Sequence, residues 1–282
     1  MMRRAQPWLG TLVEISISDD LAAPVLQQTF QAAFAAIAQI HGLMSFHAPD
    51  SDVSRINQAA VGSQLTLNPH TYTVIAAALK LSEASAGLFD IRVAGRLVEW
   101  GYLPQPEATH TTVLPYQSQA IAWRLLPDSR LEKCRNDWLD LGGIAKGYAV
   151  DQAILVLQQA GIEQACVNAG GDLRVIGVQA MEIAIRDPAA PQSMAGSVTV
   201  CNQAFATSAS YFSTRLFGEQ AVSALLHGGT GIALTEPRSI SVRAPECLWA
   251  DGLTKIVAAS GNAQHACLDL FSAEAFIISP SL

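Results

Sequence analysis

The chain has 282 residues, of which 50% are hydrophobic and 15% charged, and its formal net charge at pH 7 is −7. This apolar fraction is ample for the core of one large domain or two small ones. The acidic balance argues against a nucleic-acid partner, and no apolar run approaches the roughly 18 uncharged residues of a membrane-spanning helix.

The expected elements mix strands and helices along the chain. In chain order we expect a strand at 10–17, helices at 24–44 and 69–86, short strands around Trp123 and Trp138 with a polar turn at 127–130 between them, a helix at 146–159, strands at 165–177 and 181–187, a proline-bearing loop at 187–195, and a strand at 196–207. We see no repeat, low-complexity linker or clear boundary, so we expect one domain over residues 1–282.

The N-terminal segment enters a strand pattern at once, with neither the apolar region of a signal peptide nor a lipobox cysteine. We therefore expect a cytoplasmic location, or a periplasmic one if a leader has been removed. The five cysteines are odd in number, widely spaced and without a CxxC pair. This pattern favours buried, reduced thiols over disulfides or a metal cluster.

Two glycine-bearing turns bracket the helix predicted at 146–159. The first lies in LDLGGIAKGYAVD, residues 139–151, and the second in VNAGGD, residues 167–172. A helix N-terminus attracts phosphate, and Lys146 in the first turn adds positive charge. The pattern therefore favours a phosphate-containing ligand, although a tight strand-to-helix turn with a solvated lysine has the same sequence. Because the motif is neither GxGxxG nor a P-loop, it predicts no Rossmann fold or nucleotide triphosphatase.

These motifs, taken in order, resemble the ApbE family of FAD:protein FMN transferases. The matching segments are Leu9-Gly10-Thr11, SFHAPDSDVSRIN at 45–57, SEASAGLFDIRVAGRLVEWGY at 82–102, GGIAKGYAVD at 142–151, NAGGD at 168–172, Ala206-Thr207-Ser208 and Ala250-Asp251. The resemblance covers nearly the whole chain. It implies an α+β layered fold with the site in a cleft.

The same resemblance implies the reaction. FAD would bind with Mg²⁺ at its diphosphate, and its FMN half would move to a threonine of an acceptor flavoprotein, releasing AMP. The residues that fall where relatives contact FAD are Leu9, His47, Leu88, Phe89, Asp90, Gly142, Lys146, Tyr148 and Thr230. Leu9, Leu88 and Phe89 are equally suited to a core, and Asp90 to capping a turn. Asn168 and Asp172 are candidates for pinning the second glycine turn.

The metal ligands implied by the resemblance are the backbone carbonyl of Ala145 and the carboxylate of Asp251, and Thr254, one place before the family's threonine position, is the third candidate. If the segment is helical, Asp251, Thr254 and Lys255 share one face. However, Lys255 occupies the position of the family's threonine ligand, and an ammonium cannot coordinate a cation. Lys255 must therefore point away or stand in for the metal's charge, which puts dependence on Mg²⁺ in question.

A second departure concerns the candidate general base. Ala224 occupies the position of the family histidine, while His227 lies nearby in LLHGGTG. His227 would supply an imidazole from a displaced position if the loop were remodelled, but a histidine beside two glycines is also typical of a turn. Ser208-Ala209-Ser210 likewise replaces the family's Ser-Gly-Asp. The catalytic candidates are therefore His227, Asp251 and Lys255.

Three functions follow from this pattern. The first is FMN transfer, the second is flavin binding without catalysis, and the third is metal-dependent hydrolysis of the FAD diphosphate. All three require the turn that carries Lys146 to lie close to Asp251.

Overall fold

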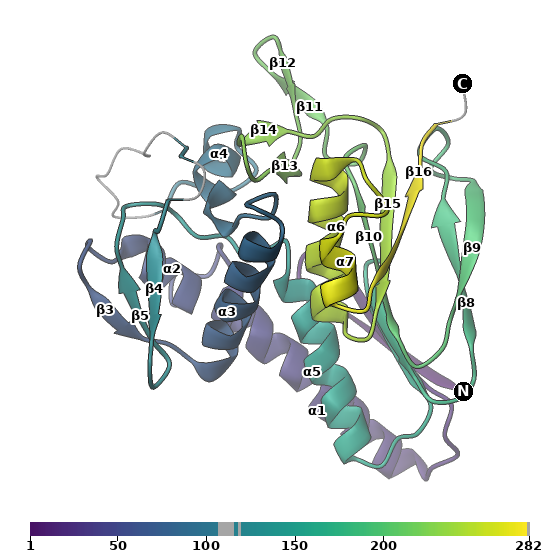
Figure 1. Cartoon of the computed structure of the whole chain (residues 1–282). Coiled ribbons are helices and arrows are strands. Elements are labelled where there is room, and N and C mark those ends of the chain that lie inside the picture. Colours follow the sequence, from purple (N-terminus) through teal and green to yellow (C-terminus); the bar gives the residue numbers. More distant parts are fainter. Residues whose placement is uncertain (107–115, 118–119, 281–282) are drawn as a thin grey trace.

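A seven-stranded antiparallel sheet forms the centre of the computed structural model, which describes residues 1–106, 116–117 and 120–280 (Figure 1). Its strand order is β1-β2-β6-β7-β10-β15-β16. The strands are β1 (Met2–Trp8), β2 (Thr11–Ile17), β6 (Ala165–Ala169), β7 (Asp172–Ile176), β10 (Ala204–Ala209), β15 (Ser239–Ala244) and β16 (Glu274–Ile278). Because β2 pairs with β6, the first strands of the chain lie directly beside the second glycine turn.

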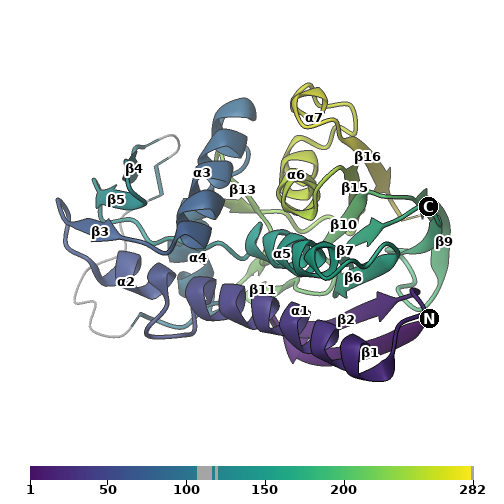
Figure 2. The same cartoon turned by 90° about the horizontal axis from the view of Figure 1, so that it is seen from below.

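Three helices cover one face of this sheet and a hairpin covers the other (Figure 2). The helices are α1 (Ala23–Met44), α5 (Ala145–Gln159) and α6 (Cys247–Ser260), and the hairpin is β8 (Met181–Arg186) with β9 (Met194–Val200). Strand alternation produces these two contacts: Val167 packs among the helices, whereas its neighbour Cys166 packs under the hairpin. None of the helices in the described residues is both long and apolar enough to cross a bilayer.

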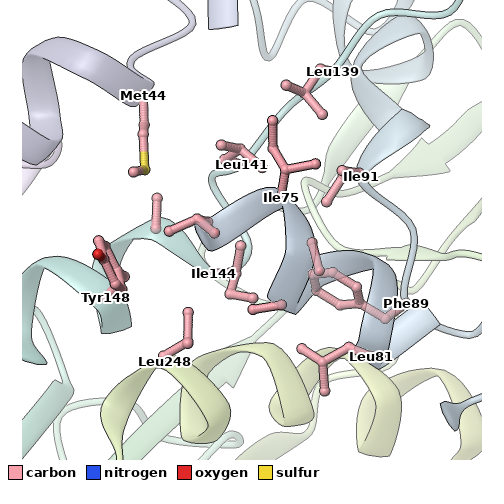
Figure 3. Packing of buried hydrophobic residues seen from close by; sticks show 14 of the residues in the cluster. Met44, Ile75, Leu81, Phe89, Ile91, Leu139, Leu141, Ile144, Tyr148 and Leu248 are labelled. Atoms are coloured by element: carbon pink, nitrogen blue, oxygen red, sulfur yellow. The ribbon is translucent and has the colours of Figure 1, made fainter. Parts of the chain in front are cut away.

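A second group of elements lies beyond α6, around α3 (Pro69–Ala84). It contains α2 (Asp52–Gln58), the small sheet β3 (Gln64–Thr66), β5 (Arg130–Lys133) and β4 (Trp123–Leu126), the 3₁₀ helix η1 (Ile91–Val93) and α4 (Ala94–Glu99). The remaining elements are the hairpins β11 (Arg215–Phe217) with β12 (Gln220–Val222) and β13 (Leu226–His227) with β14 (Ile232–Ala233), and the short helix α7 (Cys267–Leu270). A continuous apolar cluster joins α3 to α5 and α6, with Leu81, Ile144 and Leu248 among its members (Figure 3).

The α+β class is confirmed, and the three expected helices form at 23–44, 69–84 and 145–159. Two of the predicted long strands were wrong in one respect, because the structure has two separate strands in place of each. The segment 165–177 turns back at Gly170-Gly171, and the segment 196–207 breaks between β9 and β10. Trp138 is not in a strand; β4 pairs instead with β5, across the expected turn. All five cysteines lie in the described ranges and are free thiols; Cys166, Cys247 and Cys267 are buried as expected, whereas Cys134 is half-buried and Cys201 is exposed.

The first matched motif, Leu9-Gly10-Thr11, and the second glycine turn meet in space because each forms a tight hairpin turn. Leu9 and Gly10 have φ of 57° and 72°, and Gly170 and Gly171 have φ of 66° and 110°. Two-residue hairpin loops of type I′ require such positive values at both positions. A Cβ on Gly170 would lie 2.4 Å from the Thr11 hydroxyl, so only glycine lets the two turns touch. Leu9 is thereby held beside the central strands.

Helices α5 and α6 approach closely at Gly147. A Cβ at this position would lie 2.2 Å from the carbonyl oxygen of Cys247 and 2.8 Å from the Cβ of Asp251. Since the first of these atoms is backbone, the helices themselves would have to separate. Gly147 in the first motif is therefore needed for the packing of α5 against α6.

We predict that Gly147→Ala lowers the free energy of unfolding by roughly 2–4 kcal/mol, because overpacking moves α5 away from α6. The matched control is Gly42→Ala in α1, where a Cβ would meet nothing within 4 Å. That change should stabilise the protein by about 0.5–1 kcal/mol through helix propensity. Urea unfolding of both variants measures the difference; shifts of equal sign would contradict the close approach.

Candidate functional site

A cavity of about 460 Å³ lies where the C-terminal end of α1, the start of α5 and the chain between α3 and α4 meet. The β1–β2 turn and the segment before β13 complete its wall. The lining residues that bear on function are Leu9, His41, His47, Leu88, Phe89, Asp90, Tyr102, Asp140, Gly142, Ala145, Lys146, Leu225 and Lys255. Residues from both ends of the chain therefore share one concave surface.

The cavity is apolar over most of its length. Met44, Phe89 and Ile91 belong both to its lining and to the buried cluster behind it (Figure 3). Phe89 is only 4% exposed and also lines the cavity, so it belongs both to the core and to the cavity wall. Such a wall suits a flat aromatic ligand.

Lys146 and Lys255 line the polar end of the cavity, and two buried carboxylates, Asp172 and Asp251, pair with them. Lys146 Nζ lies 2.5 Å from Asp172 Oδ2 and 3.7 Å from Asp251 Oδ2. Lys255 Nζ contacts Asp251 Oδ1 and donates to the Asp251 carbonyl at 3.0 Å. We call these four side chains the Lys–Asp quartet. The first glycine turn and Asp251 thus lie together, as the sequence motifs require.

The quartet controls the charge of its members. Burial raises the pKa of Asp172, and the neighbouring Asp251 carboxylate adds to this effect while Lys146 opposes it. Burial also acts to raise the pKa of Asp251, but Lys146 and Lys255 outweigh it, so that this pKa falls below its usual value. For Lys146, burial acts to lower the pKa, but Asp172 and Asp251 together raise it. Asp251 and Lys146 are therefore both ionised at neutral pH.

Asp251 also binds backbone, as one half of a reciprocal cap. Its Oδ2 accepts the N–H of Gly147, in the first turn of α5, at 3.0 Å. In return, Asp151 of α5 accepts the N–H groups of Cys247 and Leu248, in the first turn of α6, at 3.0 and 2.8 Å. Each helix therefore supplies a carboxylate to the positive end of the other.

The expected metal ligands do not fit a divalent cation. Thr254 is fully buried, and its hydroxyl is hydrogen-bonded to Ser208 Oγ at 2.8 Å and to the Asp251 carbonyl at 2.6 Å. The Asp251 carboxylate is already shared between Lys255 and the Gly147 N–H, while Ala145 contributes to the cavity wall. Within the described ranges, no three His, Cys, Asp or Glu side chains are grouped as a metal site. The helical face predicted for Asp251, Thr254 and Lys255 is confirmed, and its polar groups are paired with one another and with Ser208 and Gly147.

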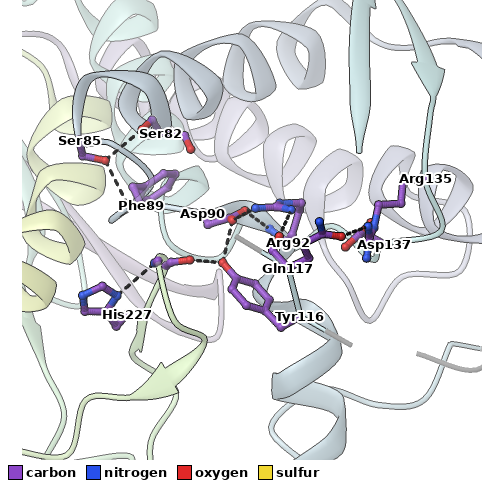
Figure 4. A network of polar contacts seen from close by, with 12 residues as sticks. Ser82, Ser85, Phe89, Asp90, Arg92, Tyr116, Gln117, Arg135, Asp137 and His227 are labelled. Carbon is purple, nitrogen blue, oxygen red and sulfur yellow. Dashed lines mark hydrogen bonds and ion pairs between the residues drawn. The ribbon is translucent and has the colours of Figure 1, made fainter. Parts of the chain in front are cut away.

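Asp90 lies in the cavity wall, where its carboxylate belongs to a polar network (Figure 4). It accepts the Arg92 Nε–H at 3.0 Å and the Tyr116 hydroxyl at 2.7 Å, and it caps η1 through the Arg92 N–H at 2.9 Å. The Tyr116 hydroxyl also contacts the carbonyl of Gly228. The capping alternative is therefore correct, and the network ties the chain after α3 to the loop after β13.

Three expected site residues lie away from the cavity surface. His227 Nδ1 accepts the Gly229 N–H at 3.1 Å, as in the turn alternative, and the segment that lines the cavity there is Ala224 to Leu226. Thr230 Oγ1 accepts the Ile232 N–H at 3.4 Å within the same turn. Tyr148 is 8% exposed, and its hydroxyl is hydrogen-bonded to His70 Nδ1 at 2.8 Å.

Sequence reasoning missed several lining residues. His41 lies in the last turn of α1, outside every motif, and Tyr102 is the last residue of the matched segment 82–102 but was not singled out. Asp140 lies next to the first glycine turn and accepts the Gly142 N–H at 3.1 Å, while its burial raises its pKa. Asp172 pairs with Lys146, and only Asn168 pins the second turn, through the Gly171 N–H at 2.8 Å. Asp140 lies within the first motif at 139–151, and that position was the signal that could have found it.

An apolar cavity that ends at a helix N-terminus and two lysines defines a site for an elongated ligand with a flat ring and an anionic group. The model of the ApbE family matches residues 9–275 of this sequence. The chain therefore belongs to the ApbE family.

Known proteins agree in sequence and in fold. The FAD:protein FMN transferase of Haemophilus influenzae is 25% identical over 268 residues, which are 87% of this chain and 77% of that protein. The Vibrio cholerae enzyme of the same name is 28% identical over 234 residues, covering 77% and 69%. The crystal structure of the Thermotoga maritima ApbE protein superposes with a TM-score of 0.83 at 24% identity, covering 98% of this chain and 93% of that one. The flavin transferase ApbE from Vibrio cholerae gives 0.79 at 24% identity, covering 99% and 94%. These two likenesses establish the fold.

We predict that Asp251→Asn removes roughly 3 kcal/mol of stability near neutral pH, because Lys255 loses its buried partner. The lowered pKa of Asp251 means that its stabilisation is present above the ordinary value of about 4 and is lost as the pH falls through the folded value. Urea unfolding of both proteins from about pH 7 to about pH 3 should show a gap that narrows in acid. A gap that widens in acid would show that burial dominates instead.

Proposed function

We propose that this protein is an FAD:protein FMN transferase, which moves the FMN half of FAD onto a threonine hydroxyl of an acceptor flavoprotein and releases AMP. The observation that carries the proposal is the cavity, whose apolar wall leads to Lys146 and Lys255 at the N-terminus of α5. The curated relatives bear this activity in their names. We further propose that residues 1–282 act as one transferase domain.

In this proposal the flavin ring lies against the apolar wall, with Leu9, Leu88 and Phe89 as its contacts. His47 and Asp140 border the same space. The ring has a large flat surface, so burying it provides most of the binding free energy, at about 25 cal/mol per Å² of apolar area.

The diphosphate lies at the Lys–Asp quartet. Lys146 and Lys255 face it as ammonium groups, and the Gly142-Gly143 turn lets backbone approach closely. During transfer the threonine oxygen forms a bond to the phosphorus of the FMN half, while the bond from that phosphorus to the bridging oxygen breaks. AMP leaves with the bridging oxygen, and the hydroxyl proton passes to water. The lysines stabilise the negative charge that develops on the departing phosphate.

The proton step has no dedicated base in this proposal. His227 is held in its turn, and the Asp90 carboxylate is occupied by Arg92 and Tyr116. A missing general base costs about 10²–10⁴-fold in rate. We therefore expect slow transfer, and flavin binding without catalysis is the second candidate that this observation favours. Hydrolysis of FAD is less favoured, because the expected metal clamp does not form around Asp251.

Incubation of the protein with FAD and an acceptor domain carrying the target threonine separates the three functions. Transfer predicts covalent flavin fluorescence on the denatured acceptor together with AMP. Hydrolysis predicts FMN and AMP without acceptor, and binding alone predicts retained FAD with neither product. An acceptor with valine in place of its threonine is the control. Absence of covalent flavin on the intact acceptor would overturn the transferase proposal.

We predict that Lys146→Met weakens FAD binding by roughly 10- to 100-fold, because a charged hydrogen bond to phosphate contributes about 1.5–3 kcal/mol. The control is Lys80→Met on α3, whose ammonium lies 5.3 Å from the centroid of the Trp249 ring and outside the cavity. Quenching of flavin fluorescence on titration measures both variants. Equal affinities for FAD would place the diphosphate elsewhere.

A further inference from the structure

We infer that the Lys255 ammonium takes the place of a divalent cation in this site, so that the protein binds the diphosphate of FAD without metal. The inference rests on the proposed function, since FAD is taken as the ligand. It begins from the position of Lys255, which lines the cavity while contacting Asp251.

The side chain of Lys255 is held in this position by packing and hydrogen bonds. It comes from the same helical turn as Asp251, and its Nζ donates to the carbonyl of that residue at 3.0 Å as well as contacting Oδ1. Its Cε would lie 3.5 Å from a Cβ on Gly143, so the stem runs along the first glycine turn. The side chain is 16% exposed, which leaves the ammonium at the cavity surface rather than in bulk water.

The charges around Asp251 oppose a cation. Lys146 Nζ lies 3.7 Å from Asp251 Oδ2, and Lys255 contacts Oδ1. A divalent ion at this carboxylate would lie next to two ammonium groups and would have to displace one of them. At about 4 Å, two like charges repel by several kcal/mol at the effective dielectric of a partly buried site. The quartet already sets two lysines against two carboxyl groups, with Asp251 ionised, so a divalent ion would add positive charge to a site that holds two cations.

The same arrangement suits a diphosphate. An ammonium that contacts both a carboxylate and open cavity is able to turn from one anion to the other. Asp251 would still accept the Gly147 N–H at 3.0 Å, and Lys146 would remain beside it. Lys255 would then pair with phosphate oxygen directly, as the cation would have done.

Titration of FAD into the wild-type protein, in EDTA and in excess Mg²⁺, is the first test. We expect affinities that agree within about threefold. Lys255→Thr removes the ammonium and puts a hydroxyl close to the helix backbone, and we expect its FAD affinity to fall by about tenfold or more in EDTA and to recover with Mg²⁺. Lys255→Met keeps the stem but has neither charge nor oxygen, so its loss should not be rescued. Wild-type binding that requires Mg²⁺, or Lys255→Met with unchanged affinity in EDTA, would overturn the inference.

The direction in which Asp251→Asn changes the affinity for FAD provides a second test. If Asp251 is the counter-ion of Lys255, then Asp251→Asn frees the ammonium for phosphate and should tighten FAD binding in EDTA, although the ligand-free protein is less stable. If Asp251 held a metal, the same change would weaken binding in Mg²⁺ and leave binding in EDTA unimproved. Thermal unfolding, measured with and without FAD, establishes that each variant is folded at the temperature of titration. If a variant is not folded, the comparison of wild-type affinities in EDTA and in Mg²⁺ still decides the question.

Two further ligands separate this inference from the proposed function. ADP carries the diphosphate without the flavin, and riboflavin carries the ring without phosphate. We expect ADP binding to lose affinity in Lys255→Met and riboflavin binding not to change. Failure of FAD to bind in EDTA and in Mg²⁺ alike would remove the proposed function, whereas binding only in Mg²⁺ would remove the inference alone.

Discussion

The contact between α5 and α6 is the constraint on which the site depends. Gly147 lets the helices meet, and the meeting brings Asp251 to the N-terminus of α5 and Asp151 to that of α6. Without this approach the Gly147 N–H would lose its buried acceptor, and Lys146 and Lys255 would face different surroundings. Packing, capping and charge therefore depend on one another. The absence of a side chain at Gly147 fixes how Asp251 lies relative to Lys146 and Lys255.

The sheet contributes by bringing distant segments to the same place. The hairpin turn at Leu9-Gly10 touches the one at Gly170-Gly171, and Asp172 follows the second turn directly. A carboxylate at the start of β7 is thus presented to Lys146 on α5. The apolar wall comes from the other side of the molecule, where the chain after α3 packs against α6. A chain of ordinary composition therefore encloses a cavity at the junction of two groups of elements.

The sequence allowed the helices α1, α3 and α5 and the two glycine turns to be predicted, because each is encoded locally, whereas α2 and α4 were not predicted. The meeting of Lys146 with Asp251, which lie far apart in the sequence, was expected from the family resemblance. Hairpins were joined into single strands, since apolar alternation continues across a tight turn such as Gly170-Gly171. His41 was overlooked because one polar residue in an alanine-rich helix carries no signal of what lies opposite. The role of Lys255 depended on which partner its ammonium finds, and only the fold places Asp251 between it and Lys146.

The cavity wall runs from Leu9 in the first hairpin to Lys255 in α6, so residues that lie far apart in the sequence are needed to build it. A ribosome must release most of the chain before the pocket exists, and a nascent protein shortened before α6 lacks both its anion-facing ammonium and the partner of the α5 N-terminus. FAD would therefore bind only to chains in which α6 has been synthesised and folded. Binding of FAD would then stabilise the folded protein only after α6 has joined the rest of the fold.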